Sequence, residues 1–184
     1  MATNNLKIGS ELPGFQLKGI DEKTYSVSSF DDKKILVIIF SCNHCPYVQA
    51  YEDRIKELQE HFENRGIQII AINSNDESGY PEDSFENMKK RAMDRNFNFL
   101  YLRDDDQSVA DKFDATHTPE VFVFNEERKL AYHGKIDDNW KEPDRVRTKY
   151  LQDAVEQLLK SEKISVPETF SIGCTIKWKK KELS

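Results

Sequence analysis

Two short, largely apolar runs dominate the first half of the chain, Ile35 to Phe40 and Ile67 to Asn73. Both are too short for a core helix and rich in β-branched residues, so each predicts a parallel strand that is buried on both faces. Between the two runs, apolar residues recur every third or fourth position, which predicts an amphipathic helix; they are Tyr51, Ile55, Leu58 and Phe62. Gly66 follows this helix and can adopt a left-handed cap. The pattern therefore predicts a β-α-β unit over residues 35–73.

Turn-forming residues and shorter patterns flank this unit. Residues 6–30 place glycines and a proline between short apolar segments, which predicts a β-hairpin that leads into the main sheet. Residues 74–84 are turn formers throughout and predict a loop at the carboxyl end of the second strand. We expect a helix over Phe85 to Met93 and a short strand over Asn98 to Leu102. Asp106, the last of three consecutive aspartates, is the expected N-cap of a short helix that follows.

The second half of the chain predicts a β-hairpin and a final helix. Val121 to Phe124 and Leu130 to His133 are apolar segments joined by a turn, so they are expected to pair as antiparallel strands. Pro143 is expected to open the last amphipathic helix, whose apolar side holds Val146, Tyr150, Leu151, Ala154, Val155, Leu158 and Leu159. We expect one domain over residues 1–163 and a tail over residues 164–184 that packs on it.

Composition limits the classes of function. A length of 184 residues suits one domain, and a formal net charge of −6 argues against a general nucleic-acid binder. The N-terminus has no apolar core of the kind that a signal peptide needs, and the longest apolar run is too short to cross a bilayer. We therefore expect a cytoplasmic protein that uses neither nucleic acid nor membrane as a partner. Three cysteines do not make a disulfide framework, and in a reducing compartment such residues are usually redox-active or metal-binding.

The cysteines give the clearest functional signal. Cys42 and Cys45, separated by two residues, follow the first buried strand and precede the first helix. Two thiols so spaced can close a small disulfide ring, and the free N–H groups of a helix N-terminus stabilise a thiolate. We expect Cys42 to be the more exposed and more acidic thiol, and Cys45 to resolve the mixed disulfide that Cys42 forms with a substrate. His44 is a candidate modulator, because positive charge beside Cys42 would lower the pKa of its thiol.

Metal binding is the alternative that the same residues leave open. A structural zinc site needs four ligands, and the chain has no second Cys-x-x-Cys and no His-x-x-x-His. Two thiolates and a histidine could instead hold copper(I), which prefers soft ligands. We expect no resident metal and no other cofactor, and keep a copper-delivery protein as an alternative function.

The chain resembles the thioredoxin superfamily, and more closely its peroxiredoxin-like members of the AhpC/TSA type. The resemblance covers nearly the whole chain and is carried by Phe40-Ser41-Cys42-Asn43-His44-Cys45-Pro46-Tyr47-Val48, by Thr118-Pro119-Glu120-Val121-Phe122 and by Gly173-Cys174-Thr175-Ile176-Lys177-Trp178. It implies a thioredoxin-like α/β fold, a three-layer α/β/α sandwich with a mixed sheet, extended by an N-terminal hairpin and a C-terminal tail. It also implies that Pro119 is cis and faces the cysteine pair, and that the backbone of Thr118 pairs with the substrate.

Departures from the relatives affect the expected activity. Peroxiredoxins carry a proline and a threonine seven and three residues before the peroxidatic cysteine. Those positions hold Ile38 and Cys42 if Cys45 has this role, or Ile35 and Ile39 if Cys42 has it. Neither alignment reproduces the peroxide site, so efficient peroxidase activity is not expected.

A second departure concerns proton transfer. Thioredoxins carry a buried aspartate six residues before the first cysteine and usually a tryptophan just before it, where this chain has Leu36 and Ser41. Glu120, beside Pro119, is a candidate substitute for that buried carboxylate. An exposed glutamate at a strand edge is the alternative interpretation.

The role of Cys174 is open to two interpretations. It could exchange with Cys42 or Cys45 as a further resolving thiol, but a buried inert cysteine is the favoured interpretation. The first hypothesis is a thiol-disulfide oxidoreductase that acts on a protein or small-molecule disulfide with an unknown thiol electron donor. A thiol peroxidase acting on peroxides and a copper-delivery protein are the alternatives.

Overall fold

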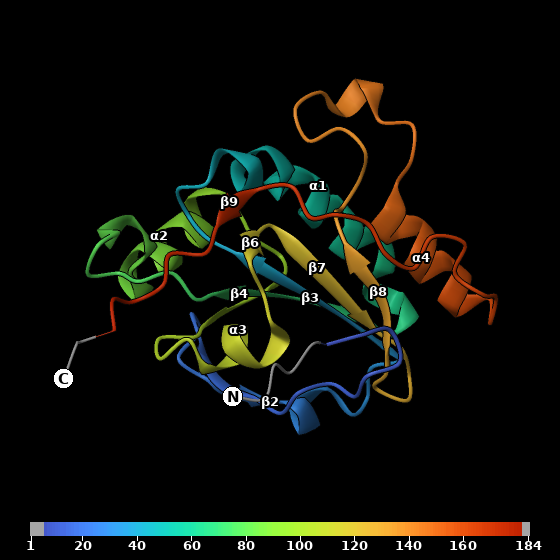
Figure 1. Cartoon of the computed structure of the whole chain (residues 1–184), viewed down its shortest axis with the longest axis horizontal. Helices are drawn as coiled ribbons and strands as arrows, with labels where there is room; N and C mark the ends of the chain where they lie inside the picture. The colour runs from blue at the N-terminus through green and yellow to red at the C-terminus, as the bar shows by residue number, and fades with distance from the viewer. Residues whose placement is uncertain (1–5, 182–184) are drawn as a thin grey trace.

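The computed structural model describes residues 6–181 and has a central seven-stranded sheet between helices (Figure 1). The strand order is β2-β1-β5-β4-β3-β7-β8, in which β3 is parallel to β4 and β4 to β5, and the other neighbours are antiparallel. The strands of this mixed sheet are β1 (Gln16–Gly19), β2 (Thr24–Ser26), β3 (Ile35–Ser41), β4 (Ile67–Asn73), β5 (Leu100–Arg103), β7 (Glu120–Phe124) and β8 (Leu130–Gly134).

A two-stranded sheet lies apart from the main one. It pairs β6 (His117–Thr118) with β9 (Cys174–Thr175). The helices are α1 (Pro46–Phe62), α2 (Phe85–Asp94), α3 (Ser108–Phe113) and α4 (Tyr150–Leu159), with short 3-10 turns at Val27–Phe30, Glu63–Arg65, Pro81–Asp83 and Pro143–Arg145.

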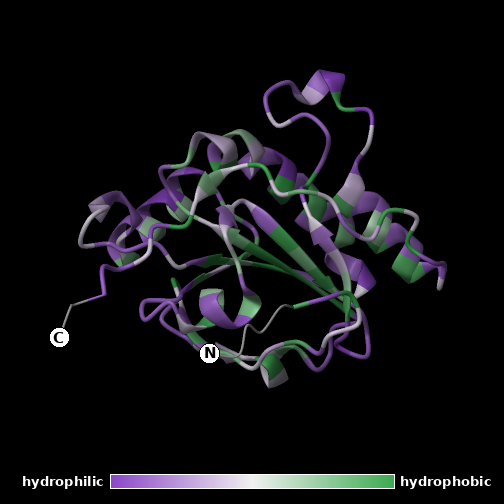
Figure 2. Cartoon of the chain, in the orientation of Figure 1, coloured by the Kyte–Doolittle hydropathy of each residue, from purple (hydrophilic) through white to green (hydrophobic). Residues whose placement is uncertain are grey.

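The two faces of the sheet are covered by different helices. Side chains of β3 alternate, so that Ile35, Val37 and Ile39 pack into one core cluster with residues of α1, α2 and α4. Leu36, Ile38 and Phe40 pack on the opposite face with residues of α3 and of the N-terminal hairpin. Figure 2 shows hydrophobic colour along the central strands and hydrophilic colour on much of the helices. This is the expected three-layer α/β/α arrangement, and it explains why β3 is buried at every position.

Most elements match the expectation from the sequence. The β-α-β unit, the hairpin within residues 6–30 and the β7–β8 hairpin are all present. Gly66 has a left-handed φ of 76° directly after the turn that extends α1. β5 begins at Leu100 rather than at Asn98.

The start of the last helix was predicted wrongly. Pro143 opens a single 3-10 turn, and α4 begins only at Tyr150. Between them Val146 is extended, and the Asp138 carboxylate accepts a hydrogen bond from Arg147 N at 2.9 Å. This local contact favours a loop where the apolar spacing predicted a helix.

The N-cap of α3 was also misplaced. Gln107, not Asp106, is the N-cap residue, with a left-handed φ of 63°. Asp106 accepts from Ser108 N instead, and the buried Asp104 accepts from the N–H groups of Val109 and Ala110.

The residues after α4 return across the molecule. Thr169 N donates to His133 O at 3.0 Å beside β8, and Ile176 N donates to Thr116 O at 2.9 Å beside β6. In Figure 1 this red segment runs from α4 along α1 to β9. A domain boundary at residue 163 stays a prediction. Within residues 6–181, every helix is too short or too polar to cross a membrane.

Candidate active site

The candidate site lies where β3 ends and α1 begins. Cys42 follows the last residue of β3, and Cys45 is the N-cap of α1, which opens with Pro46. Proline is well suited to the first helical position, because its missing N–H would have no helical partner there. The side chains of Cys42 and Cys45 are only 2% and 0% exposed, and both thiols are free. Both cysteines are thus buried, and Cys42, expected to be the more exposed of the two, exceeds Cys45 by only this small difference.

Thr118 lies against both thiols. Cys42 Sγ is 3.5 Å from Thr118 Oγ1, and Cys45 Sγ is 3.4 Å from Thr118 O. The peptide bond between Thr118 and Pro119 is cis, as the resemblance implied. β7 begins directly after this dipeptide and pairs with β3, with Glu120 opposite Phe40. This pairing places Thr118 and Pro119 beside the cysteines that follow β3.

The acidity of the two thiols is the reverse of the prediction. The Cys42 thiol hydrogen-bonds to the Cys45 sulfur, which lowers the pKa of Cys45, and the N–H groups of Val48 and Cys174 lower it further. The same bond raises the pKa of Cys42, and burial and the negative charge of Asp83 raise it more. The lowered pKa therefore belongs to Cys45 and the raised pKa to Cys42.

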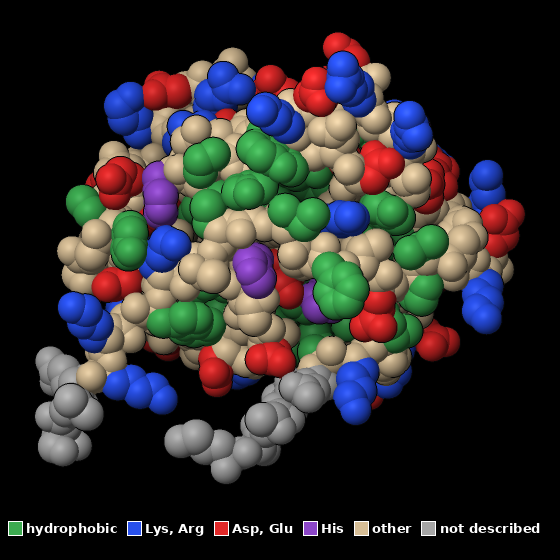
Figure 3. Space-filling model, turned by 45° about the horizontal axis from the view of Figure 1, so that its top comes forward, with side chains coloured by type: hydrophobic (Ala, Val, Ile, Leu, Met, Phe, Trp, Pro, Cys, Tyr) green, Lys and Arg blue, Asp and Glu red, His purple; other side chains and the backbone are tan. Residues whose placement is uncertain are grey.

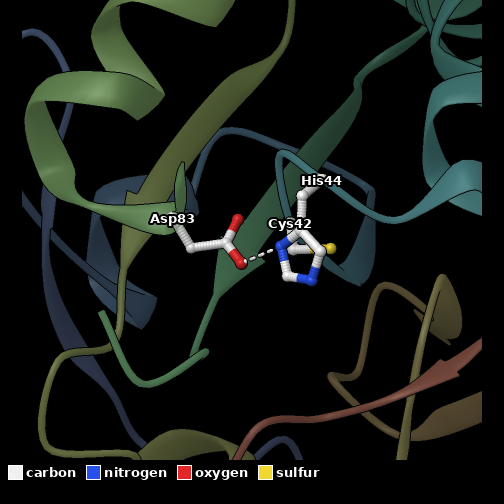
Figure 4. Close-up of side chains that lie close together, drawn as sticks. All are labelled: Cys42, His44 and Asp83. Carbon is white, nitrogen blue, oxygen red and sulfur yellow. Dashed lines mark ion pairs between the residues drawn. The ribbon is translucent and has the colours of Figure 1, made fainter. Parts of the chain in front are cut away.

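Asp83, in the 3-10 turn Pro81–Asp83, is a buried carboxylate that sequence reasoning missed. It is fully buried, and its Oδ2 lies 2.5 Å from His44 Nδ1 (Figure 4). His44 thus faces Asp83, and its ring also stacks on Tyr80 with centroids 5.4 Å apart. The expected influence of His44 on the pKa of Cys42 stays a prediction.

A hydrogen-bond network fixes Asp83 beside the cysteines. Asp83 Oδ1 accepts from Asn43 N at 2.6 Å, and Oδ2 accepts from Asn75 Nδ2 at 2.9 Å. The Asn43 side chain in turn accepts from the buried Tyr101 hydroxyl at 2.7 Å. Asp83 therefore holds the backbone between the two cysteines. The only hint in the sequence is its place in a polar loop after β4, where the carboxyl ends of parallel strands meet.

Three of these side chains are close enough to share a metal ion. Single ligand atoms of Cys42, His44 and Asp83 all lie within 4.8 Å of one another. However, the Asp83 oxygens already accept hydrogen bonds from Asn43 N and Asn75 Nδ2. A carboxylate is also a poor ligand for copper(I).

Glu120 is buried, so the exposed-glutamate interpretation was wrong. Its side chain is 3% exposed and hydrogen-bonds to His133 Nε2 at 2.7 Å, and it accepts from Thr116 N at 2.7 Å and His117 N at 3.0 Å. Burial acts to raise the pKa of Glu120, but His133 and the two N–H groups outweigh it and hold the pKa below its usual value. Glu120 therefore fixes the loop before Thr118. Its contacts run to that loop and to β8, and its proton-transfer role stays a prediction.

Cys174 lies at the same site. It is half-buried and packs against the cluster of Cys42, Cys45 and Val48. In the β6–β9 ladder its partner is Thr118, the residue expected to pair with a substrate. Cys174, far along the sequence from Cys42 and Cys45, thus meets them at Thr118.

Comparison with known proteins assigns the family. Residues 8–133 match the AhpC/TSA family. Two curated relatives are the thiol-disulfide oxidoreductase ResA of Bacillus subtilis, 27% identical over 67% of this chain, and a Haemophilus influenzae protein named peroxiredoxin bcp, 24% identical over 60%. The matches span 64% and 66% of the relatives' own lengths, just under two thirds.

Solved structures support the fold. An uncharacterized conserved protein from Geobacillus kaustophilus is 35% identical, with a TM-score of 0.89 over 97% of this chain and 95% of that one. The thioredoxin domain of a thiol-disulfide oxidoreductase from Bacteroides vulgatus is 16% identical, with a TM-score of 0.60 over 70% of this chain and 89% of that domain. This second likeness shows that the chain has a thioredoxin-like fold.

Proposed function

The chain belongs to the AhpC/TSA family, and from this premise we propose that it is a thiol-disulfide oxidoreductase in which Cys42 and Cys45 cycle between dithiol and disulfide. The observation that carries the proposal is the pair of buried thiols at the start of α1, both within 3.5 Å of Thr118. The raised pKa of Cys42 and the lowered pKa of Cys45 support a pair in which Cys42 keeps its proton while Cys45 ionises. A dithiol in this state is prepared to give up two electrons.

Reduction of a disulfide substrate then takes two exchanges. The Cys45 thiolate accepts the Cys42 proton as the Cys42 sulfur attacks the substrate, which forms a mixed disulfide and releases one substrate thiolate. That thiolate takes the proton from Cys45. The Cys45 thiolate attacks the Cys42 sulfur, releases the second substrate thiolate and closes the Cys42–Cys45 disulfide. An external thiol donor reverses the sequence.

The neighbouring residues have supporting roles in this proposal. The backbone of Thr118 binds the substrate beside Pro119 once the tail strand β9 has moved away, because β9 now pairs with Thr118. The substrate is a protein or small-molecule disulfide. A reducing compartment such as the cytoplasm would keep the pair as a dithiol.

Turnover of a disulfide substrate by single variants tests the proposal. Cys42→Ser and Cys45→Ser should each lose at least about a hundredfold in rate, since neither can close the disulfide. Cys45→Ser should accumulate a mixed disulfide at Cys42, because the resolving thiol is missing. Met93→Ser, which removes a sulfur that is 73% exposed on α2, serves as the control and should keep the wild-type rate. Equal rates for wild type and Cys42→Ser would refute the function, and a mixed disulfide found on Cys45 in Cys42→Ser but absent from Cys45→Ser would refute the order of attack.

A thiol peroxidase is the second candidate, favoured by the family and by the lowered pKa of Cys45. The Cys45 thiolate would attack the peroxide oxygen, releasing an alcohol or water and leaving a sulfenic acid, which Cys42 would convert to a disulfide with loss of water. Stopped-flow measurements would then show consumption that saturates with peroxide and disappears in Cys45→Ser. A rate no faster than that of a free thiol at the same pH excludes this candidate.

A further inference from the structure

The tail strand β9 lies directly over the cysteine pair. It pairs antiparallel with β6, with Thr118 opposite Cys174 and His117 opposite Thr175. Thr118 is also the residue whose carbonyl oxygen lies 3.4 Å from Cys45 Sγ. The pairing therefore brings the third thiol of the chain to the other two.

Gly173 makes this close approach possible. A Cβ atom added at Gly173 would lie 2.0 Å from Thr118 O and 3.1 Å from Pro119 N. Any other residue there would push the tail away from Thr118 by steric overlap with the backbone. The contact between tail and site thus depends on one glycine directly before Cys174.

Contacts on both sides hold the strand in place. On one side, Lys177 N donates to Asn75 Oδ1 at 2.9 Å, and Asp76 N donates to Lys177 O at 2.8 Å. On the other side, Thr169 N donates to His133 O at 3.0 Å. Ile176, between Cys174 and Lys177, is buried in the core at 4% exposure. A thiol held between two anchors meets its neighbours at a high effective concentration.

The electrostatics at the three sulfurs agree with this geometry. Cys174 contributes both its thiol and its backbone N–H to the lowering of the pKa of Cys45. Burial raises the pKa of Cys174, and the neighbouring Cys45 raises it further, so Cys174 stays protonated while Cys45 is ionised. Because Cys42 and Cys45 are almost fully buried, a protein substrate reaches them only if β9 moves.

We propose that Cys174 is a third redox thiol of the site, which exchanges with the Cys42–Cys45 disulfide to form a Cys45–Cys174 disulfide. This step rests on the proposed dithiol-disulfide cycle of the pair and deepens it. The Cys174 thiol loses its proton, and its sulfur attacks Cys45 Sγ. The Cys42–Cys45 bond breaks, and Cys42 leaves as a thiolate that takes up the proton. One disulfide is lost and one is formed, so the step needs no further oxidant.

The exchange would change both the access to the site and the thiol that remains reduced there. A Cys45–Cys174 disulfide fixes β9 over Thr118 and leaves Cys42 as a reduced thiol. The oxidised protein would then be closed to protein substrates until a donor thiol opens the tail bond. Cys174 is thus a catalytic thiol rather than the inert cysteine that the sequence favoured.

Disulfide mapping in a Cys42→Ser variant tests the proposal. The full chain is treated with one equivalent of diamide, quenched with acid and alkylated, and its peptides are mapped by mass spectrometry. We expect the monomer to contain a Cys45–Cys174 disulfide. In wild type after the same treatment we expect both Cys42–Cys45 and Cys45–Cys174 bonds.

A glycine variant supplies the geometric control. Cys42→Ser with Gly173→Ala should form the Cys45–Cys174 bond at least about tenfold more slowly than Cys42→Ser alone, because the tail no longer reaches Thr118. Cys42→Ser with Gly14→Ala should match Cys42→Ser, since a Cβ at Gly14 meets nothing within 4 Å.

Two results would overturn the proposal: two free thiols in oxidised Cys42→Ser monomers, or a bond that forms equally fast with Gly173→Ala. Neither depends on turnover of an external substrate. If wild type reduced no disulfide substrate while Cys42→Ser still formed the bond, the proposed function would fail and the third thiol would stand.

Discussion

Asp83 provides the sharpest test of how this site sets thiol acidity. Its carboxylate raises the pKa of Cys42, after the hydrogen bond to Cys45 and the burial of the thiol. A Cys45→Ser, Cys174→Ser background leaves Cys42 as the single thiol and removes its hydrogen bond to the Cys45 sulfur. Asp83→Asn in this background removes the charge while keeping an oxygen that can accept from Asn43 N.

The structure gives the size of the expected effect. The ligand atoms of Cys42 and Asp83 lie within 4.8 Å of each other. At that distance two unit charges interact by about 3.5 kcal/mol at an effective dielectric constant of about 20. This energy corresponds to about 2.5 pH units. A proton on His44, 2.5 Å from Asp83, would cancel part of it, so we expect the pKa of Cys42 to fall by at least about one pH unit.

The assay is the rate of iodoacetamide alkylation of Cys42 as a function of pH. The midpoint of this profile reports the pKa, while the plateau at high pH reports how often the buried thiol becomes accessible. Asp104→Asn is the matched control, because Asp104 is equally buried but caps α3 through Val109 and Ala110. An unchanged or raised midpoint with Asp83→Asn, or an equal fall with Asp104→Asn, would refute the electrostatic role of Asp83.

Three further outcomes follow from other contacts. Glu120→Gln should cost about 2 kcal/mol of unfolding free energy at pH 7. Because the folded pKa of Glu120 lies below its usual value, this contribution is present above pH 4.5 and should fade as the pH falls through the folded pKa. Urea unfolding at several pH values measures it, with the exposed Glu126→Gln as control. Arg91→Met should lower the free energy of unfolding by about 3 kcal/mol, because it removes a partner 2.6 Å from the buried Glu52. Lys90→Met, which breaks an exposed pair with Asp94, should lower it by less than about 1 kcal/mol. Similar losses for the two variants in thermal melts would contradict this. Copper(I) should leave the reduced protein when a competing chelator is added, because the Asp83 oxygens already have donors; stoichiometric copper retained after dialysis would favour the copper-delivery function.

The parts of the fold that rest on hydrophobic periodicity could be predicted from the sequence. β3 and β4 carry runs of apolar residues that suit only strands buried on both faces, and both lie where the sequence indicated. The last helix was different, because the apolar spacing from Val146 onward was helical while the hydrogen bond from Arg147 N to the Asp138 carboxylate keeps that segment extended. Local hydrogen bonds of this kind leave no periodic signal.

The candidate site shows a similar division. Cys42, Cys45 and Thr118 could be identified from spacing and resemblance, but the acidity of the thiols depends on neighbours that are distant in the sequence. Asp83 reaches Asn43 across 40 positions, and Cys174 reaches Thr118 through the β6–β9 pairing. Such neighbours follow from the tertiary packing of loops and could not be ranked from one sequence.

The surface of the tail is partly hydrophobic. Large hydrophobic side chains of the tail remain exposed, with Phe170 at 93% and both Ile172 and Trp178 at 45%. Figure 3 shows hydrophobic side chains gathered across the middle of one face, with charged side chains around them.

Redox titration of the pair tests the central claim most directly. Cys174→Ser is equilibrated in buffers of oxidised and reduced dithiothreitol, and the fraction of free thiols is measured by alkylation and mass spectrometry. We predict one reversible two-electron transition, assigned to Cys42 and Cys45, that is absent from the Cys42→Ser, Cys174→Ser double variant. A Cys174→Ser protein that keeps both thiols free across the whole range of buffers would contradict the dithiol-disulfide cycle.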